Sequence, residues 1–267
     1  MLTPPNMSVR AHSLPGLNRR KLLKRVRCWS SRRYWREIHQ QQAGRRGFVI
    51  GNGPSLRMTD LDRLQGEVCL AANRIYLAFD QTRWRPDYVT VADAVLWPKI
   101  REEIGQHIPT LHAVADLDPA PGVAMHYYAY RGRADDHPES PAVPPAYSAN
   151  VLEGIVGGYT VTFDNLQLAE HLGLNPIYLL GCDHFYAGES GQEDEGQAIR
   201  NVSTQNHFSP NYRDVGEPVN PAPIAQMNRA FREAQRYAQA NGRTIANATR
   251  GGHLDIFPRV DFDALFR

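Results

Sequence analysis

Residues 47–56 read GFVIGNGPSL, an apolar run that passes directly into a turn with a glycine on each side of an asparagine. The run Phe48-Val49-Ile50 has the length and composition of a strand buried on both faces, as in a parallel sheet. At the carboxyl end of such a strand, a glycine turn lets backbone N–H groups approach an anion closely. The stretch therefore predicts the first strand of an α/β fold, followed by a nucleotide or sugar-phosphate loop or by an ordinary tight turn.

The turn Gly51-Asn52-Gly53-Pro54-Ser55 matches neither of the two common nucleotide motifs. It has no lysine where a P-loop carries one, and its glycines do not have the G-x-G-x-x-G spacing of dinucleotide-binding proteins. Neither an ATP-hydrolysing site nor an NAD site is therefore indicated.

From residue 47 onward, short apolar runs alternate with helical patterns, which predicts a Rossmann-like, mostly parallel sheet flanked by helices. The expected strands are residues 47–52, 67–73, 87–93, 111–117, 176–183 and 243–249, and the expected long helices are 160–172 and 223–240. Residues 118–150 hold six prolines with little periodicity, and 187–222 include an acidic, glycine-broken segment. We expect these two segments to form irregular lid elements of one catalytic domain, residues 47–267.

The charge is divided unevenly along the chain. Residues 1–46 hold 12 Lys and Arg but one acid, Glu37, whereas the remainder holds 18 basic and 27 acidic residues. Residues 1–46 are thus expected to form a basic amphipathic arm, with Leu22, Leu23, Val26, Trp29, Trp35 and Ile38 on one side of a broken helix. Such an arm suits an anionic membrane surface, at about 1 kcal/mol per nearby Lys or Arg. A solvated tail and a nucleic-acid contact are the alternatives.

Two further features indicate the cellular compartment. No run approaches the roughly 20 apolar residues that cross a bilayer, and the N-terminus lacks the apolar centre of a secretory signal. The three cysteines, Cys28, Cys69 and Cys182, form no C-x-x-C pair and are expected to be reduced thiols. We therefore expect a cytoplasmic protein, peripheral to the plasma membrane if the arm binds lipid.

Polar residues follow several of the expected strands, at the edge of the sheet where α/β proteins bind ligands. They are Asn52, Asn73, Asp93, Asp183, His184, Asn247 and Thr249. Turns and helix caps also favour Asn and Asp, so each has a structural interpretation as well. His207, in the expected loop TQNHFSPNY, is a candidate general base or a structural histidine. His184, His207, His253 and Asp183 have no metal-ligand spacing, so no metal site is expected.

VIGNGPSL followed by TDLDRL, and later GGYTVTFDNLQLAEHLGLNPIYLLGCDHFY, resemble the sialyltransferases of glycosyltransferase family 42. The same motifs resemble the wider superfamily of Maf flagellin glycosyltransferases and 6-hydroxymethylpterin diphosphokinase-like proteins. NHFSPNY and ANATRGGHLDIFPRVDF are similar to bacterial members encoded beside surface-polysaccharide genes. The resemblance covers the chain from about residue 47 to its end, and it implies a single Rossmann-like domain with a lid.

The sialyltransferase resemblance also implies roles for individual residues. Asn52 and Ser55 would lie at the donor phosphate or ribose and Asn73 beside the nucleotide. Gly158 and Thr160 would contact the donor, and Tyr186 would hydrogen-bond the leaving phosphate. Two positions depart from the family pattern: Asp93 replaces an asparagine, and Asn211 stands where the family has its catalytic histidine. The candidate catalytic residues are thus His207, Tyr186 and Asp183, and the candidate nucleotide-binding residues are Gly51, Asn52, Gly53, Pro54, Ser55, Asn73, Asp93, Gly158 and Thr160.

Three hypotheses follow for the function. The first is a metal-independent glycosyltransferase that moves a sugar, a nonulosonic acid from a CMP-linked donor, to a surface glycan or lipid-linked acceptor. The second is a diphosphokinase in which Asp93 and Asp183 bind Mg²⁺ and ATP supplies the diphosphate. The third is a nucleotide-binding protein without catalysis, which the asparagine at position 211 keeps open. Nucleic acid is not an expected partner.

Overall fold

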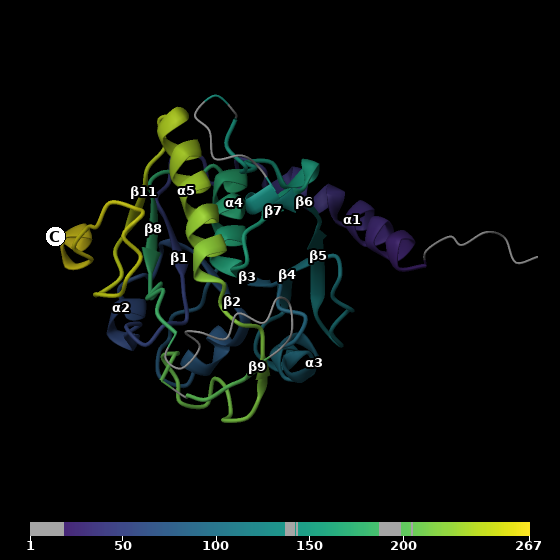
Figure 1. Cartoon of the computed structure of the whole chain (residues 1–267), viewed down its shortest axis with the longest axis horizontal. Helices are drawn as coiled ribbons and strands as arrows, with labels where there is room; N and C mark the ends of the chain where they lie inside the picture. Colours follow the sequence, from purple (N-terminus) through teal and green to yellow (C-terminus); the bar gives the residue numbers. More distant parts are fainter. Residues whose placement is uncertain (1–18, 137–141, 143, 187–198, 204) are drawn as a thin grey trace, which may run out of the picture.

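The computed structural model describes residues 19–136, 142, 144–186, 199–203 and 205–267. Its centre is a sheet of seven parallel strands in the order β11-β8-β1-β2-β3-β4-β5, surrounded by helices (Figure 1). The strands are Gly47–Ile50 (β1), Val68–Ala72 (β2), Tyr88–Val91 (β3), Thr110–Val114 (β4), Ala124–Tyr128 (β5), Ile177–Leu180 (β8) and Ile245–Asn247 (β11). The Rossmann-like α/β fold that the sequence predicts is confirmed.

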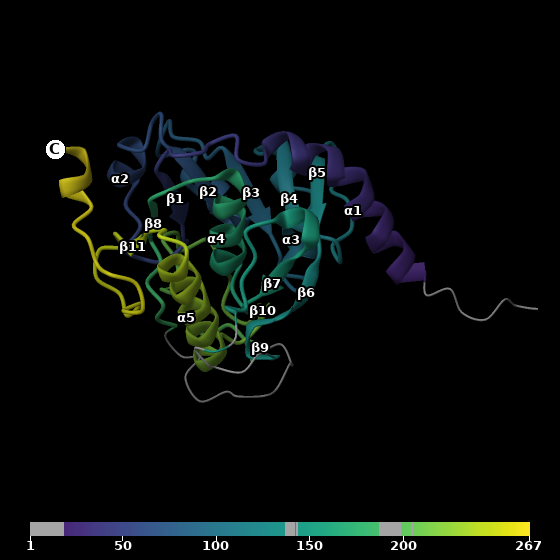
Figure 2. The same cartoon turned by 90° about the horizontal axis from the view of Figure 1, so that it is seen from above.

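Helices and two small strand pairs complete the described part of the chain. The α-helices are Arg19–Ile38 (α1), Met58–Asp62 (α2), Trp97–Ile100 (α3), Val161–Leu172 (α4) and Ile224–Ala240 (α5), and the 3₁₀ helices are Asn73–Ala78 (η1), Ile104–Gln106 (η2), Ala134–Asp136 (η3), Val151–Glu153 (η4) and Asp263–Phe266 (η5). Tyr130–Arg133 (β6) pairs with Ile155–Gly157 (β7), and Ile199–Arg200 (β9) with Pro218–Val219 (β10). Helices α4 and α5 lie on the same face of the sheet (Figure 2).

The central strands are buried on both faces, which is why they read as continuous apolar runs. In β1, Phe48, Val49 and Ile50 are each at most 1% exposed. Both long predicted helices are also present, and α4 ends where Gly173 adopts a left-handed conformation with φ of 85°.

The strand order places a topological switch point beside β1. From β1 the chain adds β2, β3, β4 and β5 in one direction, and it then returns to add β8 on the other side of β1. In open α/β sheets the crevice outside the carboxyl ends of the strands at such a point is the usual place for a ligand. The turn that follows β1 and the turn that follows β8 therefore occupy the favoured position for a site.

The segment 118–150, predicted to be an irregular lid element, contains β5, the strand at one edge of the main sheet. β5 pairs in parallel with β4 from Ala124 to Tyr128. Its first residues are exposed or half-buried, so it lacks the continuous apolar run by which the central strands are recognised. That interpretation of the segment was wrong because an edge strand carries a weaker sequence pattern than a central one.

Helix α1 is a continuous helix whose second half packs on the domain. Trp35 is 2% exposed, and its Nε1 donates a hydrogen bond to the Tyr127 carbonyl at 2.8 Å. The Ser31 hydroxyl accepts one from the Tyr127 N–H at 2.7 Å. These side chains satisfy backbone groups on β5, the last strand of the sheet, and so cover an otherwise open edge. The expectation of a separate broken arm is therefore wrong for the second half of α1, which is part of the domain.

Candidate functional site

The glycine turn after β1 packs directly against the turn after β8. The Gly53 N–H donates to the Gly181 carbonyl at 2.9 Å. A Cβ atom at Gly51 would overlap the Gly181 carbonyl oxygen, and one at Gly53 would overlap the Asp183 carboxylate. Both glycines are thus required by the close approach of two protein segments, whether or not an anion also binds here.

Asp183 stabilises this turn through its side chain. Its Oδ2 accepts hydrogen bonds from the Ser55 hydroxyl at 2.8 Å and from the Ser55 N–H at 3.3 Å. Burial raises the pKa of the carboxyl group, and the two Ser55 hydrogen bonds counter part of that effect. Ser55 was predicted to lie at the donor phosphate or ribose and Asp183 to act in catalysis; in the structure the two residues bind each other.

Asn52 connects the ends of β1 and β2, because its Nδ2 donates to the Ala72 carbonyl at 3.1 Å. Asn73 follows β2 in a left-handed conformation with φ of 54°. The Oδ1 atoms of both asparagines are buried and accept no hydrogen bond from the described residues. Since such an acceptor is costly to bury unpaired, both amides are suited to a ligand that supplies hydroxyl or amino donors.

The loop between β9 and β10 brings His207 to the glycine turn. The N–H of the next residue, Phe208, donates to the Asn52 carbonyl at 3.0 Å. The imidazole stacks on Tyr212, with ring centroids 3.8 Å apart and planes 6° from parallel. Burial, with a smaller contribution from the positive charges of Arg213 and Arg74, lowers the pKa of His207 to about 3, although the Glu217 charge acts in the opposite direction. His207 is therefore an uncharged imidazole beside two cations.

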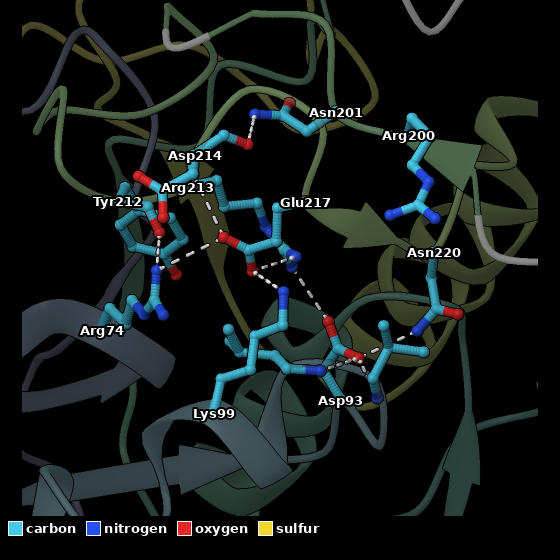
Figure 3. Close-up of polar contacts among 12 residues, drawn as sticks. Arg74, Asp93, Lys99, Arg200, Asn201, Tyr212, Arg213, Asp214, Glu217 and Asn220 are labelled. Carbon is cyan, nitrogen blue, oxygen red and sulfur yellow. Dashed lines mark hydrogen bonds and ion pairs between the residues drawn. The ribbon is translucent and has the colours of Figure 1, made fainter.

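A cluster of charged residues lies next to His207, and Figure 3 shows its polar contacts. The Glu217 carboxylate, only 4% exposed, is 3.0 Å from Lys99 Nζ and 3.9 Å from an Arg74 nitrogen. Burial alone would raise the pKa of Glu217, but the Lys99 and Asp214 N–H hydrogen bonds and the Arg74 charge outweigh it and hold the pKa low. Glu217 is therefore a buried anion held between cations.

Asp93 belongs to the same cluster and is engaged by several donors. Its carboxylate accepts hydrogen bonds from the backbone N–H groups of Val95 at 2.9 Å and Leu96 at 3.1 Å. It also accepts from the Asn220 amide at 2.9 Å and from Arg213 at 3.1 Å. The Asp93 carboxylate, predicted to contact a nucleotide, is thus already hydrogen-bonded to protein groups. A ligand beside it would contact Arg213, one of those groups.

The cluster holds three cations, Arg74, Lys99 and Arg213, against the two carboxylates of Asp93 and Glu217. Arg74 Nε and one terminal nitrogen of Arg213 are buried and donate no hydrogen bond within the described structure. An excess of positive charge with spare guanidinium donors is the arrangement that binds phosphate or carboxylate groups. None of the three cations was predicted from the sequence. Two features could have indicated them: Arg74 directly follows Asn73, and Arg213 is four positions before Glu217, with which it pairs.

Gly158 and Thr160 form the entry to α4. The Thr160 hydroxyl caps the helix by accepting from the Thr162 N–H at 3.3 Å. A Cβ at Gly158 would overlap the side chains of Phe163 and Ala230, so this glycine is required by packing.

A buried acid lies in the first turn of α4. The Asp164 carboxylate accepts hydrogen bonds from the Tyr128 hydroxyl at 2.8 Å and the Tyr130 hydroxyl at 2.5 Å. Burial raises the pKa of Asp164 to about 7, although both tyrosine hydrogen bonds act in the opposite direction. This carboxyl group ties α4 to the end of β5.

The remaining predicted residues lie around the β8 and β11 ends. Tyr186 is partly buried, with its ring 6.5 Å from that of His184, whose Nε2 is 2.8 Å from Asn228 Oδ1. The Thr249 hydroxyl accepts from the Cys182 N–H at 3.0 Å, and Asn247 donates to the Leu254 carbonyl at 2.8 Å. Asn247 and Thr249 therefore stabilise the fold rather than face a ligand.

Within the described ranges, no three His, Cys, Asp or Glu side chains come together as a metal site would require. The acidic segment predicted from Glu189 to Gly196 lies outside those ranges. No protein-family model, curated protein or solved structure matches this chain.

Proposed function

We propose that this protein is a glycosyltransferase that uses a nucleotide-activated sugar. A CMP-linked nonulosonic acid is the proposed donor, and a surface glycan or a lipid-linked molecule is the proposed acceptor. The observation that carries the proposal is the uncharged His207 held beside Arg74 and Arg213, next to the glycine turn at the switch point. This arrangement combines a proton acceptor with anion-binding groups, which a transfer from a sugar phosphate requires.

In the proposed reaction, His207 accepts the proton of an acceptor hydroxyl on a ring nitrogen. The acceptor oxygen forms a bond to the anomeric carbon while the bond from that carbon to the phosphate oxygen breaks. The nucleotide phosphate leaves with the bonding electrons, and Arg74 and Arg213 stabilise its charge. A single displacement of this kind inverts the configuration at the anomeric carbon. Tyr186 would donate a further hydrogen bond to the leaving phosphate.

The low pKa of His207 fits this scheme because the donor itself carries negative charge. In the free protein, burial and, to a smaller extent, the two arginine charges disfavour protonation of the imidazole. A bound phosphate offsets their charge, so it raises the pKa of His207 towards the range useful to a general base. The imidazole would thus be a stronger base with the donor bound than without it.

The diphosphokinase alternative places Mg²⁺ on Asp93 and Asp183. Asp93 accepts hydrogen bonds from two backbone N–H groups and from the side chains of Asn220 and Arg213. Asp183 accepts two hydrogen bonds from Ser55. A magnesium ion would have to displace donors from Asp93, both of whose carboxylate oxygens accept hydrogen bonds. The alternative therefore requires a rearrangement that the glycosyltransferase proposal does not.

Thermal-shift measurements with CMP, CDP, UDP, GDP and ATP, each with and without Mg²⁺, test the proposal. Stabilisation by CMP without Mg²⁺ is expected, because the arginines provide the phosphate contacts. A response to ATP that depends strictly on Mg²⁺ would favour the diphosphokinase. A nucleotide response in a protein that hydrolyses or transfers no donor would favour the non-catalytic alternative.

The role of His207 is tested by His207→Ala, with the exposed His107→Ala as the matched control. We expect His207→Ala to lower transfer by about 10²- to 10⁴-fold, the usual contribution of a general base, with CMP binding retained. Full activity in this variant would refute the assignment. The proposed location is the cytoplasm, at the inner membrane face if the acceptor is lipid-linked.

A further inference from the structure

Helix α1 has apolar residues on two opposite sides. Trp35 and Ile38 are 2% and 8% exposed and pack on the domain, whereas Leu22, Val26 and Trp29 are 47%, 52% and 75% exposed. At about 100° per residue, the latter three fall within about 60° of one another, on the side of the helix roughly opposite the packed one. We call Leu22, Val26 and Trp29 the outer stripe. Five of the six apolar residues predicted to share one side are thus divided between two sides, and Leu23, 43% exposed, lies between them.

The packed side prevents the outer stripe from turning towards the core. Arg27 donates to the Ala115 carbonyl at 3.0 Å and to Asp118 at 2.7 Å, and Lys24 pairs with Asp116. With Trp35 and Ser31 further along, these contacts fix the rotation of the helix about its axis. Figures 1 and 2 both show α1 running out past β5 at one end of the molecule. The outer stripe therefore faces away from the protein.

Basic residues flank the outer stripe. Lys21, Arg25, Arg32 and Arg36 are exposed and lie along one side of it, between about 40° and 100° away at 100° per residue. None of the four has a carboxylate partner in the described part of the chain. The acid of this helix, Glu37, pairs with Arg33 at 2.7 Å. The surface thus combines an apolar stripe that includes tryptophan with a uniformly positive flank.

We propose that the outer side of α1 binds the surface of an anionic lipid bilayer, with the stripe in the interface and the basic flank on the lipid headgroups. Charge complementarity selects this partner, since an apolar protein groove would not require four unpaired cations beside the stripe. No helix in the described ranges is long and apolar enough to cross a bilayer, so α1 would lie along the surface. This inference is independent of the proposed glycosyl transfer.

Co-sedimentation of the full chain with vesicles tests the proposal. The vesicles are phosphatidylcholine alone or phosphatidylcholine mixed with phosphatidylserine, and they contain no nucleotide or sugar acceptor. We expect binding to the mixed vesicles, weakened by salt, and little binding to phosphatidylcholine alone. Arg25→Gln and Arg32→Gln should each reduce partitioning by roughly fivefold, and Trp29→Ser together with Val26→Ser by at least as much.

Matched controls come from exposed residues elsewhere on the protein. Val215→Ser replaces a valine that is 68% exposed, and Arg83→Gln removes an exposed cation, both outside α1. These variants should bind vesicles like the unchanged protein. Equal binding by the α1 variants and the controls would overturn the proposal, as would no binding to either vesicle. A dimer in sedimentation velocity that Val26→Ser abolishes would instead identify a second copy of the chain as the occupant.

Discussion

Replacing Trp35 by alanine should destabilise the protein by about 4 kcal/mol. Trp35 is 2% exposed against β5, and truncation of a buried tryptophan costs about 3 to 5 kcal/mol in lost burial and residual cavity. The variant also loses the 2.8 Å hydrogen bond to the Tyr127 carbonyl. Since domains are stable by only about 5 to 15 kcal/mol, a substantial part of the total would be lost.

Urea unfolding followed by circular dichroism measures this loss. With a denaturant dependence of about 3 kcal/mol per molar urea for a chain of this size, a loss of 4 kcal/mol lowers the midpoint by about 1.3 M. Trp29→Ala is the matched control, because this tryptophan lies on the same helix but is 75% exposed. Its midpoint should stay within about 0.2 M of the unchanged protein, as expected for a surface substitution. Equal midpoints for the two variants would refute the packing of α1 on the sheet edge.

Three further outcomes follow from the site. Gly53→Ala should lower the unfolding midpoint strongly, because the new methyl group meets the Asp183 carboxylate, whereas Gly157→Ala, with ordinary contacts only, should be tolerated. Asp164→Asn should flatten the fall in stability between about pH 4 and pH 7. The pKa of this buried acid is raised to about 7, so over that range the folded state keeps a proton that the unfolded chain has lost. The free energy of unfolding therefore falls by about 1.4 kcal/mol per pH unit as the pH rises, and the variant should lose that dependence. In the absence of ligand, the His207 ring should stay neutral down to about pH 3, as followed by NMR.

Each of these outcomes has a result that would contradict it. Equal midpoints for the two glycine variants would remove the packing reason for the turn. An unchanged pH profile in Asp164→Asn would show that other acids set the pH dependence. Titration of His207 near pH 6.5 in the free protein would mean that the imidazole is solvated and not held among the arginines.

The central strands could be predicted from the sequence because burial on both faces determines their composition directly. Phe48-Val49-Ile50 is apolar at every position, so neither pairing partners nor register are needed to recognise it. β5 is different, since its half-exposed residues are stabilised by α1, which is distant in the chain. Its assignment requires knowledge of that tertiary contact.

The candidate site was predictable only in part, for a similar reason. The sequence indicated the strand ends, and with them Asn52, Asn73 and Asp93, because all parallel strands end at one edge. It did not indicate that Arg213 would reach Asp93, 120 positions earlier in the chain. A cluster of this kind depends on how a long loop folds back, and single-residue patterns carry no information about that. The same loop determines the low pKa of His207.

The contact between Trp35 and Tyr127 also bears on how the chain assembles during its synthesis. The two residues are 92 positions apart. At about 5 to 20 residues per second, α1 leaves the ribosome about 5 to 18 s before its partner strand is made. During that interval, Trp35 and Ile38 have no sheet to cover, and the helix presents apolar residues on both sides to its surroundings. The first helix in the described chain therefore cannot be fixed in place until β5, near the middle of the chain, has been made.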